Sequence, residues 1–136
     1  MADSESARLD VDIENDVPQI FAAYPPLQHD RNHLKVTVED GVIKARGYVK
    51  NAQNRDILKR EASKIEGIKG VDVSGVYDDG GLRIESGQVT PVGVYSTVSY
   101  GAVVLTGEKP EGMSDDELIQ KVESIPGVRK VILNLR

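Results

Sequence analysis

The chain has 136 residues and a formal net charge of −5, with 39% hydrophobic and 29% charged residues, a composition typical of a soluble globular protein. It contains no cysteine, which excludes disulfide bonds, thiolate metal sites and thiol catalysis. No stretch approaches the roughly 18 apolar residues of a membrane span, and the acidic start is unlike a secretory signal. We therefore expect a cytoplasmic protein, or an envelope-associated one if the chain belongs to a longer protein. The negative charge argues against nucleic acid as a partner.

The N-terminal part of the chain is predicted to be an acidic leader followed by a helix. Six acids and a single base, Arg8, occupy residues 1–16, so residues 1–12 are assigned to the leader. Apolar residues at helical spacing predict a helix over 13–24, with Asp16 as its cap and Pro18 in its first turn. Alternation of Leu9, Val11 and Ile13 leaves a short strand as the competing prediction.

The next segment has the pattern of a hairpin, a helix and a third strand. Leu34, Val36 and Val38 alternate with polar residues, Asp40-Gly41 is a hairpin signal, and 42–49 reads as the return strand. Asn51 is expected to cap a helix that stops at Gly67 in the left-handed conformation. Residues 71–77 then predict a strand.

A period of sixty residues relates this segment to the rest of the chain. Gly41, Gly47 and Gly67 recur as Gly101, Gly107 and Gly127, and the apolar positions between them recur in the same register. The second copy is predicted to contain strands at 94–99 and 102–108, a helix opened by a Ser114 capping box, and a last strand around 131–135.

The second copy is expected to lack the first helix. Asp78-Asp-Gly-Gly81 is a strong turn signal, and residues 82–84 read as extended. The predicted fold class is therefore α+β, with two αββαβ-type units of which the second is degenerate. The boundaries are a leader at 1–12, a first unit at 13–78, an extended linker at 79–93 and a second unit at 94–136.

These residues resemble the BON domain, a small bacterial module. Its pattern of Val-x-Val, glycine, an apolar strand ending in Gly-x-Val, a helix and Gly-Val-x-x-Val is similar to residues 36–49 and 66–71, and again to 98–107 and 126–131. In the second copy Gly107 precedes the charged pair Glu108-Lys109 instead of an apolar pair. The resemblance implies an αββαβ fold, no catalysis and no cofactor. It also implies contact with phospholipid or envelope surfaces and, in one soluble branch, potassium binding.

A basic surface on the first unit is the candidate contact with anionic phospholipid. Strand alternation turns Ile43, Ala45 and Val49 inward and leaves outward-facing bases on the strands, which more bases on the following helix are expected to join. The candidate lipid-binding residues are Lys35, Lys44, Arg46, Tyr48, Arg55 and Lys59. The alternative is a solvated face whose bases pair with neighbouring acids such as Asp56 and Glu61.

The second unit offers a different outer face, which favours self-association into a homo-oligomer. Apolar and β-branched residues on a sheet face normally have a cover, supplied here by another part of the chain or by a second copy. The candidate self-association residues are Tyr95, Ala102, Val104 and Ile132.

Catalytic and metal sites are not expected. His29 and His33 lie in a predicted loop without an evident third ligand, and the acids at 115–117 suit the first turn of a helix. We find no Ser–His–Asp order and no phosphate-cradling glycine loop. The function expected is that of a non-enzymatic module that binds anionic phospholipid. The alternatives are an assembly protein and, more remotely, a potassium sensor.

Overall fold

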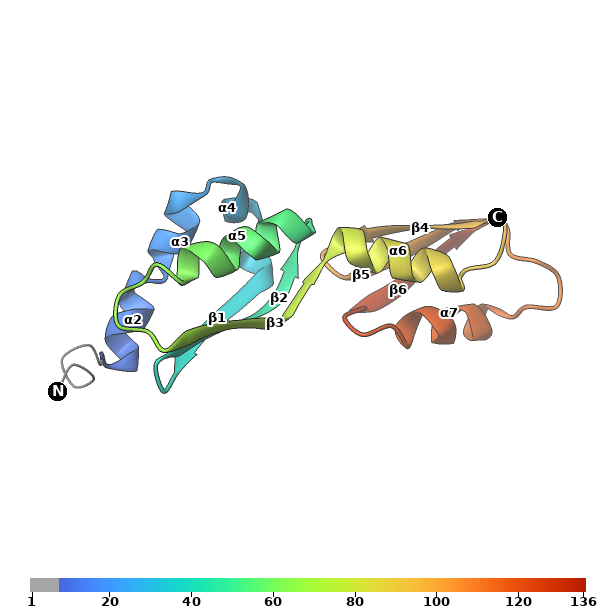
Figure 1. Ribbon diagram of the computed structural model, residues 1–136. Coiled ribbons are helices and arrows are strands. Elements are labelled where there is room, and N and C mark those ends of the chain that lie inside the picture. Colours follow the sequence, from blue (N-terminus) through green and yellow to red (C-terminus); the bar gives the residue numbers. More distant parts are fainter. Residues whose placement is uncertain (1–7) are drawn as a thin grey trace. The chain divides into compact units, whose positions relative to one another are not determined.

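The computed structural model describes residues 8–136, which form two compact units with the boundary between Val76 and Tyr77. Each unit contains one three-stranded sheet together with helices (Figure 1). The predicted α+β class is confirmed. Within the described residues, no helix combines the length and the apolar character needed to cross a bilayer.

The first unit begins with a run of short helices that precedes its sheet. Its elements are α2 (Asp10–Asp16), α3 (Pro18–Ala23), α4 (Pro26–Asp30), the 3-10 turn η1 (Arg31–His33), β1 (Leu34–Glu39), β2 (Val42–Val49), α5 (Ala52–Ala62) and β3 (Gly70–Asp78), with strand order β1-β2-β3. Residues 10–12, assigned to the leader, are helical, which also rules out the competing strand. Asp16 does not cap a helix: it is the last residue of α2, Val17 is the N-cap residue of α3, and the Asp16 carboxylate pairs with Arg8 at 2.8 Å.

The second unit contains a helix where an extended linker was predicted. Its elements are α6 (Asp79–Val89), β4 (Val94–Ser99), β5 (Ala102–Gly107), α7 (Asp115–Glu123) and β6 (Lys130–Leu135), with strand order β4-β5-β6. The prediction that this unit lacks its first helix is wrong. Asp78 caps α6 by accepting a hydrogen bond from the Gly81 N–H at 2.8 Å. Leu82 and Ser86 lie on the buried face of this helix. The Asp-Asp-Gly-Gly sequence is the start of a helix and not a chain reversal.

Helix α6 takes the place in the second unit that α2 takes in the first. The carboxylate of Asp79, the first residue of α6, accepts hydrogen bonds from the backbone N–H groups of Tyr100 (2.7 Å) and Gly101 (3.1 Å). The carboxylate of Asp10, the first residue of α2, accepts the equivalent bonds from Asp40 and Gly41, both at 2.9 Å. In both units, therefore, the carboxylate of the first residue of the first helix accepts both N–H groups of the hairpin turn and fixes the helix to it. We call this contact the Asp clamp.

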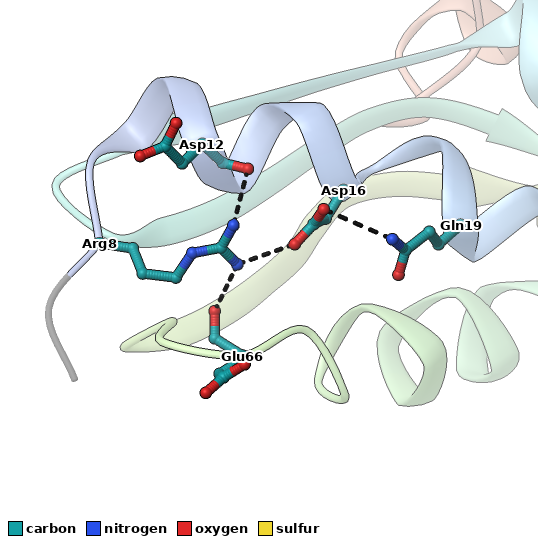
Figure 2. Close-up of polar contacts among 5 residues, drawn as sticks. All are labelled: Arg8, Asp12, Asp16, Gln19 and Glu66. Atoms are coloured by element: carbon teal, nitrogen blue, oxygen red, sulfur yellow. Dashed lines mark hydrogen bonds and ion pairs between the residues drawn. The ribbon is translucent and has the colours of Figure 1, made fainter.

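The residue two positions before each clamp aspartate contacts the loop between the second helix and the last strand of its unit. Arg8 donates hydrogen bonds to the Asp12 carbonyl, the Asp16 carboxylate and the Glu66 carbonyl, and so ties α2 to the loop between α5 and β3 (Figure 2). In the second unit Tyr77 lies against Gly127, in the equivalent loop, so closely that a Cβ on this glycine would collide with the ring. Two different side chains, Arg8 and Tyr77, thus make the equivalent contact in the two units.

The repeated glycines are required by backbone geometry. The turns Asp40-Gly41 and Tyr100-Gly101 both have positive φ at their two central residues, as a type I′ hairpin demands. At Gly47 and Gly107 the chain passes so close to the carbonyl oxygens of His33 and Gly93 that any side chain would clash. The glycines recur in the sequence because both units need a type I′ turn and a close approach of two backbone segments.

Each sheet buries one face beneath its helices. In the first unit Ile43 and Val49 pack in one core with Ile57 and Leu58 of α5, and in the second Val103 and Leu105 pack with Leu118 and Val122 of α7. The inward positions predicted from strand alternation are confirmed, Ile43, Ala45 and Val49 being buried. The opposite faces hold the candidate functional residues.

Candidate functional site

The open face of the first sheet is a shallow groove bordered by charged side chains. Successive outward positions of β1, β2 and β3 line it, and its volume is about 410 Å³. The polar residues that define this charged face are Lys35, Thr37, Glu39, Lys44, Arg46, Asp72 and Ser74.

Part of the charge on this face is neutralised internally. The Lys44 ammonium lies 2.8 Å from the Glu39 carboxylate, and the hydrogen bond to Glu39 raises the pKa of Lys44 above its ordinary value. The pKa of Asp72 is lowered, chiefly because the hydroxyl and backbone N–H of Ser74 donate to its carboxylate. The Lys44 ammonium and the Asp72 carboxylate are therefore both charged at neutral pH.

Two cations on the charged face stand directly opposite each other. Lys35 of β1 is the register partner of Arg46 of β2, and both side chains are exposed. Neither forms an ion pair within residues 8–136. Like charges at directly opposed strand positions are mutually destabilising, so an anion between them would be stabilising.

The six residues predicted to bind lipid do not form one surface. Lys35, Lys44 and Arg46 lie on the charged face, and Tyr48 is half-buried further along β2. Arg55 and Lys59 belong to α5, which covers the opposite side of the sheet, and the Arg55 guanidinium donates to the Val76 carbonyl at 3.4 Å. Alternation along the strands located half of the set, but adding the helix bases to it mixed two sides of the sheet.

The open face of the second sheet is almost free of charge. We call it the uncharged face, and its outward residues are Tyr95, Thr97, Ser99, Ala102, Val104, Thr106, Ile132 and Asn134, with Lys130 at one margin. Thr97, Val104 and Ile132 are neighbours in register across the three strands. Tyr95 is 68% exposed and Ile132 is 42% exposed. All four predicted self-association residues lie at outward register positions of these strands, but Ala102 is buried, with 7% of its surface exposed.

A shift of sixty residues superimposes the two open faces position by position. Every charged position of the first face has an uncharged counterpart in the second: Lys35 corresponds to Tyr95, Glu39 to Ser99, Lys44 to Val104, Arg46 to Thr106 and Asp72 to Ile132. The two copies of the repeat thus share the core, the turns and the clamps, but one exposed face is charged and the other is not. This exchange is visible in the sequence once outward positions are compared across the period.

The remaining candidates do not gather into a metal site. His29 lies in α4 and His33 in η1, where a loop was expected, and nearby Asp30 is fully buried and accepts a hydrogen bond from the Asn54 amide at 2.9 Å. Asp115 opens α7 and pairs with Lys109. From residue 8 onward, no three His, Asp or Glu side chains are grouped so that they could hold a metal ion.

Comparison with known proteins identifies the family of the first unit. The BON domain matches residues 9–76, which is half of the chain. This protein belongs to the BON domain family. The predicted resemblance is confirmed, and membership of the BON family points to a non-catalytic binding or assembly module.

Two of the solved structures that match cover most of the chain at low sequence identity. One is the C-terminal domain of CdsD, the structural protein of the type III secretion system of Chlamydia trachomatis, with 14% identity, a TM-score of 0.45, and coverage of 94% of this chain and 98% of that one. A second structure of CdsD has 14% identity, a TM-score of 0.35 and 91% coverage of both chains. No curated protein matches this BON protein.

Proposed function

We propose that this BON protein is a non-catalytic assembly module whose second unit self-associates through the uncharged face. The observation that carries the proposal is the loss of all five charged positions of the charged face in the repeat, with Tyr95 and Ile132 exposed in their place. Exposed apolar residues on a sheet face indicate a contact surface. At the positions equivalent to the five charges of the first sheet this face has no charge to attract an ionic ligand, and a second copy of the same face is a self-complementary partner.

The geometry suits face-to-face packing of two sheets. Sheets pack about 10 Å apart when side chains of the two inner faces interdigitate. The row formed by Thr97, Val104 and Ile132 crosses all three strands, so it supplies a continuous β-branched strip for such a contact. A two-fold axis through this strip would bring each Val104 near its counterpart in the partner.

The test introduces two lysines into the strip. In the double variant Val104→Lys and Ile132→Lys, unpaired charges would be buried at the contact, so the oligomer should dissociate into folded monomers. Light scattering on the eluting protein measures the mass. The control carries Thr37→Lys and Ser74→Lys, which add the same charge to the charged face. A wild-type protein that is monomeric throughout, or an oligomer that survives the two lysines, would refute the proposal.

A second candidate function is docking on an anionic phospholipid surface through the charged face. The opposed pair Lys35 and Arg46 favours it, because an anion placed between them relieves their repulsion. Each base held at an anionic leaflet contributes roughly 1 kcal/mol. The acids Glu39 and Asp72 on the same face offset part of this attraction, and for that reason docking ranks second.

Sedimentation with anionic vesicles at low salt tests the docking candidate. Arg46→Glu should reduce vesicle binding about tenfold or more, since it removes one base and adds an acid at the surface. Lys59→Glu makes the same change of charge on α5 and should leave most of the binding intact. Equal losses in the two variants would show that overall charge, and not the charged face, governs binding. The cation-sensing alternative stays a prediction.

A further inference from the structure

A groove between α6 and β4 in the second unit has the form of a peptide-binding site. The groove, of about 450 Å³, is lined by Arg83 and Gly87 of α6, by the connection from Thr90 to Gly93 and by the first half of β4. Helix α6 packs directly against β4 (Figure 1). The Ser86 hydroxyl donates to the Ser96 hydroxyl at 2.8 Å. We propose that this groove binds an extended peptide segment that carries a carboxylate and adds to the free edge of β4.

The shorter connection of the second unit is what leaves this space. In the first unit 24 positions separate the clamp residue Asp10 from the start of β1 at Leu34, and α3, α4 and η1 fill them. In the second unit only 15 positions separate Asp79 from Val94, and after α6 four residues complete the connection. Leu27 of α4 is fully buried in the first core, whereas Val92 of the shorter connection is 99% exposed.

The edge of β4 offers backbone hydrogen-bonding groups to a ligand. β4 is an outer strand of its sheet, and among the described residues it pairs only with β5. In a two-residue hairpin the residues that flank the turn, Ser99 and Ala102, form a hydrogen-bonded pair, and such pairs then alternate along the strands. The N–H and C=O groups of Ser96 and Val98 therefore point away from β5, toward the free edge, where an added strand would pair.

Gly87 leaves room for the added chain on the helix side of the groove. It lies inside α6, where glycine costs about 0.5–1 kcal/mol relative to alanine. Outside its chain neighbours and the nearby backbone of α6, no atom of residues 8–136 lies within 4 Å of the position a Cβ would take, and φ is not in the left-handed range, so neither packing nor backbone conformation demands glycine here. A helical glycine that faces a groove permits the close approach of another backbone.

Arg83 determines the chemistry of the ligand. It is the one charged residue among those lining the groove, it is exposed, and its guanidinium makes no ion pair within residues 8–136. A planar guanidinium binds carboxylates in a bidentate manner. Val92, which is 99% exposed, adds apolar surface to the lining of the groove. The ligand that fits is an extended segment of alternating β-branched residues with an Asp or Glu, or a C-terminal carboxylate, placed near Arg83.

The test is a selection of random octapeptides displayed on phage, followed by affinity measurement with the enriched, fluorescein-labelled peptide. We expect enrichment of alternating β-branched residues with an acid. Gly87→Leu fills the groove and favours the helix, so this variant should fold and bind at least about tenfold more weakly. Arg83→Glu should weaken binding to a similar extent. Ile84→Glu, at an exposed position of α6 outside the groove lining, should bind as wild type does.

Amide hydrogen exchange identifies how the peptide binds. Strand addition predicts that the amides of Ser96 and Val98 gain protection when the enriched peptide is present. The proposal is overturned if no peptide is enriched, if Gly87→Leu binds as tightly as wild type, or if these two amides are unaffected. Protection that appears without peptide and rises with protein concentration would instead assign the edge to a second copy of the chain. Gly87 and Arg83 lie outside the uncharged face, so these outcomes are independent of the assembly test.

Discussion

At the scale of single residues, one carboxylate per unit joins the first helix to the hairpin turn. Asp79 is 9% exposed and accepts two backbone hydrogen bonds, from Tyr100 and Gly101. Because both central residues of a type I′ turn have positive φ, their N–H groups point to the same side, where a single carboxylate can accept from both. This side chain therefore links two elements that are about twenty residues apart in the chain.

Removing this carboxylate should destabilise the second unit. Asp79→Ala leaves two N–H groups without their acceptor, and we expect a loss of about 1.5–3 kcal/mol in the free energy of unfolding, as for hydrogen bonds to charged groups. Urea unfolding of the full chain measures the loss. The control is Asp116→Ala, an exposed acid in the first turn of α7, which should lose no more than about 0.5 kcal/mol. Equal effects of the two substitutions would mean that the clamp contributes nothing beyond helix-end electrostatics.

At the scale of elements, the helices with local start signals could be predicted and α6 could not. The Asn51 side chain accepts from the Asn54 N–H at 2.7 Å, and the Ser114 hydroxyl accepts from the Glu117 N–H at 3.1 Å, as their spacing predicted. The cap of α6 is Asp78, the last residue of a strand, and the first turn of the helix contains two glycines. A pattern-based prediction reads this combination as a turn.

The buried positions of α6 are not all apolar, so the helix lacks a clear apolar periodicity in the sequence. Its inward positions include Leu82 and Ser86, and Ser86 is fully buried although it is polar. The hydroxyl of Ser86 is satisfied by a hydrogen bond to Ser96, a partner ten residues away in the sequence, on β4. No apolar periodicity marks such a position, so the helix depends on a tertiary contact that the local sequence does not contain.

The same reasoning explains which part of the candidate site was predictable. Outward positions on strands follow from alternation alone, so Lys35, Lys44 and Arg46 were placed together correctly. Helix α5 lies on the opposite side of the sheet, and its bases Arg55 and Lys59 could be assigned only once that packing was known.

At the scale of the whole molecule, one fold is used twice with two different exposed chemistries. The core, the type I′ turns and the Asp clamps recur, while the open face changes from five charged positions to none at the equivalent places. The residues that maintain the fold and the residues that give each exposed face its chemistry therefore occupy separate positions of the repeat. A module of this kind can diverge in function without any change in its fold.

Exchanging the two faces tests this account most directly. A variant that gives the second sheet the charges of the first carries Tyr95→Lys, Ser99→Glu, Val104→Lys, Thr106→Arg and Ile132→Asp. All five positions lie on the open side of the sheet, so the core is untouched. Sedimentation equilibrium over a wide concentration range should show association for the wild-type chain and a folded monomer for the exchanged one. Association of equal strength in both proteins would contradict the assignment of assembly to the uncharged face.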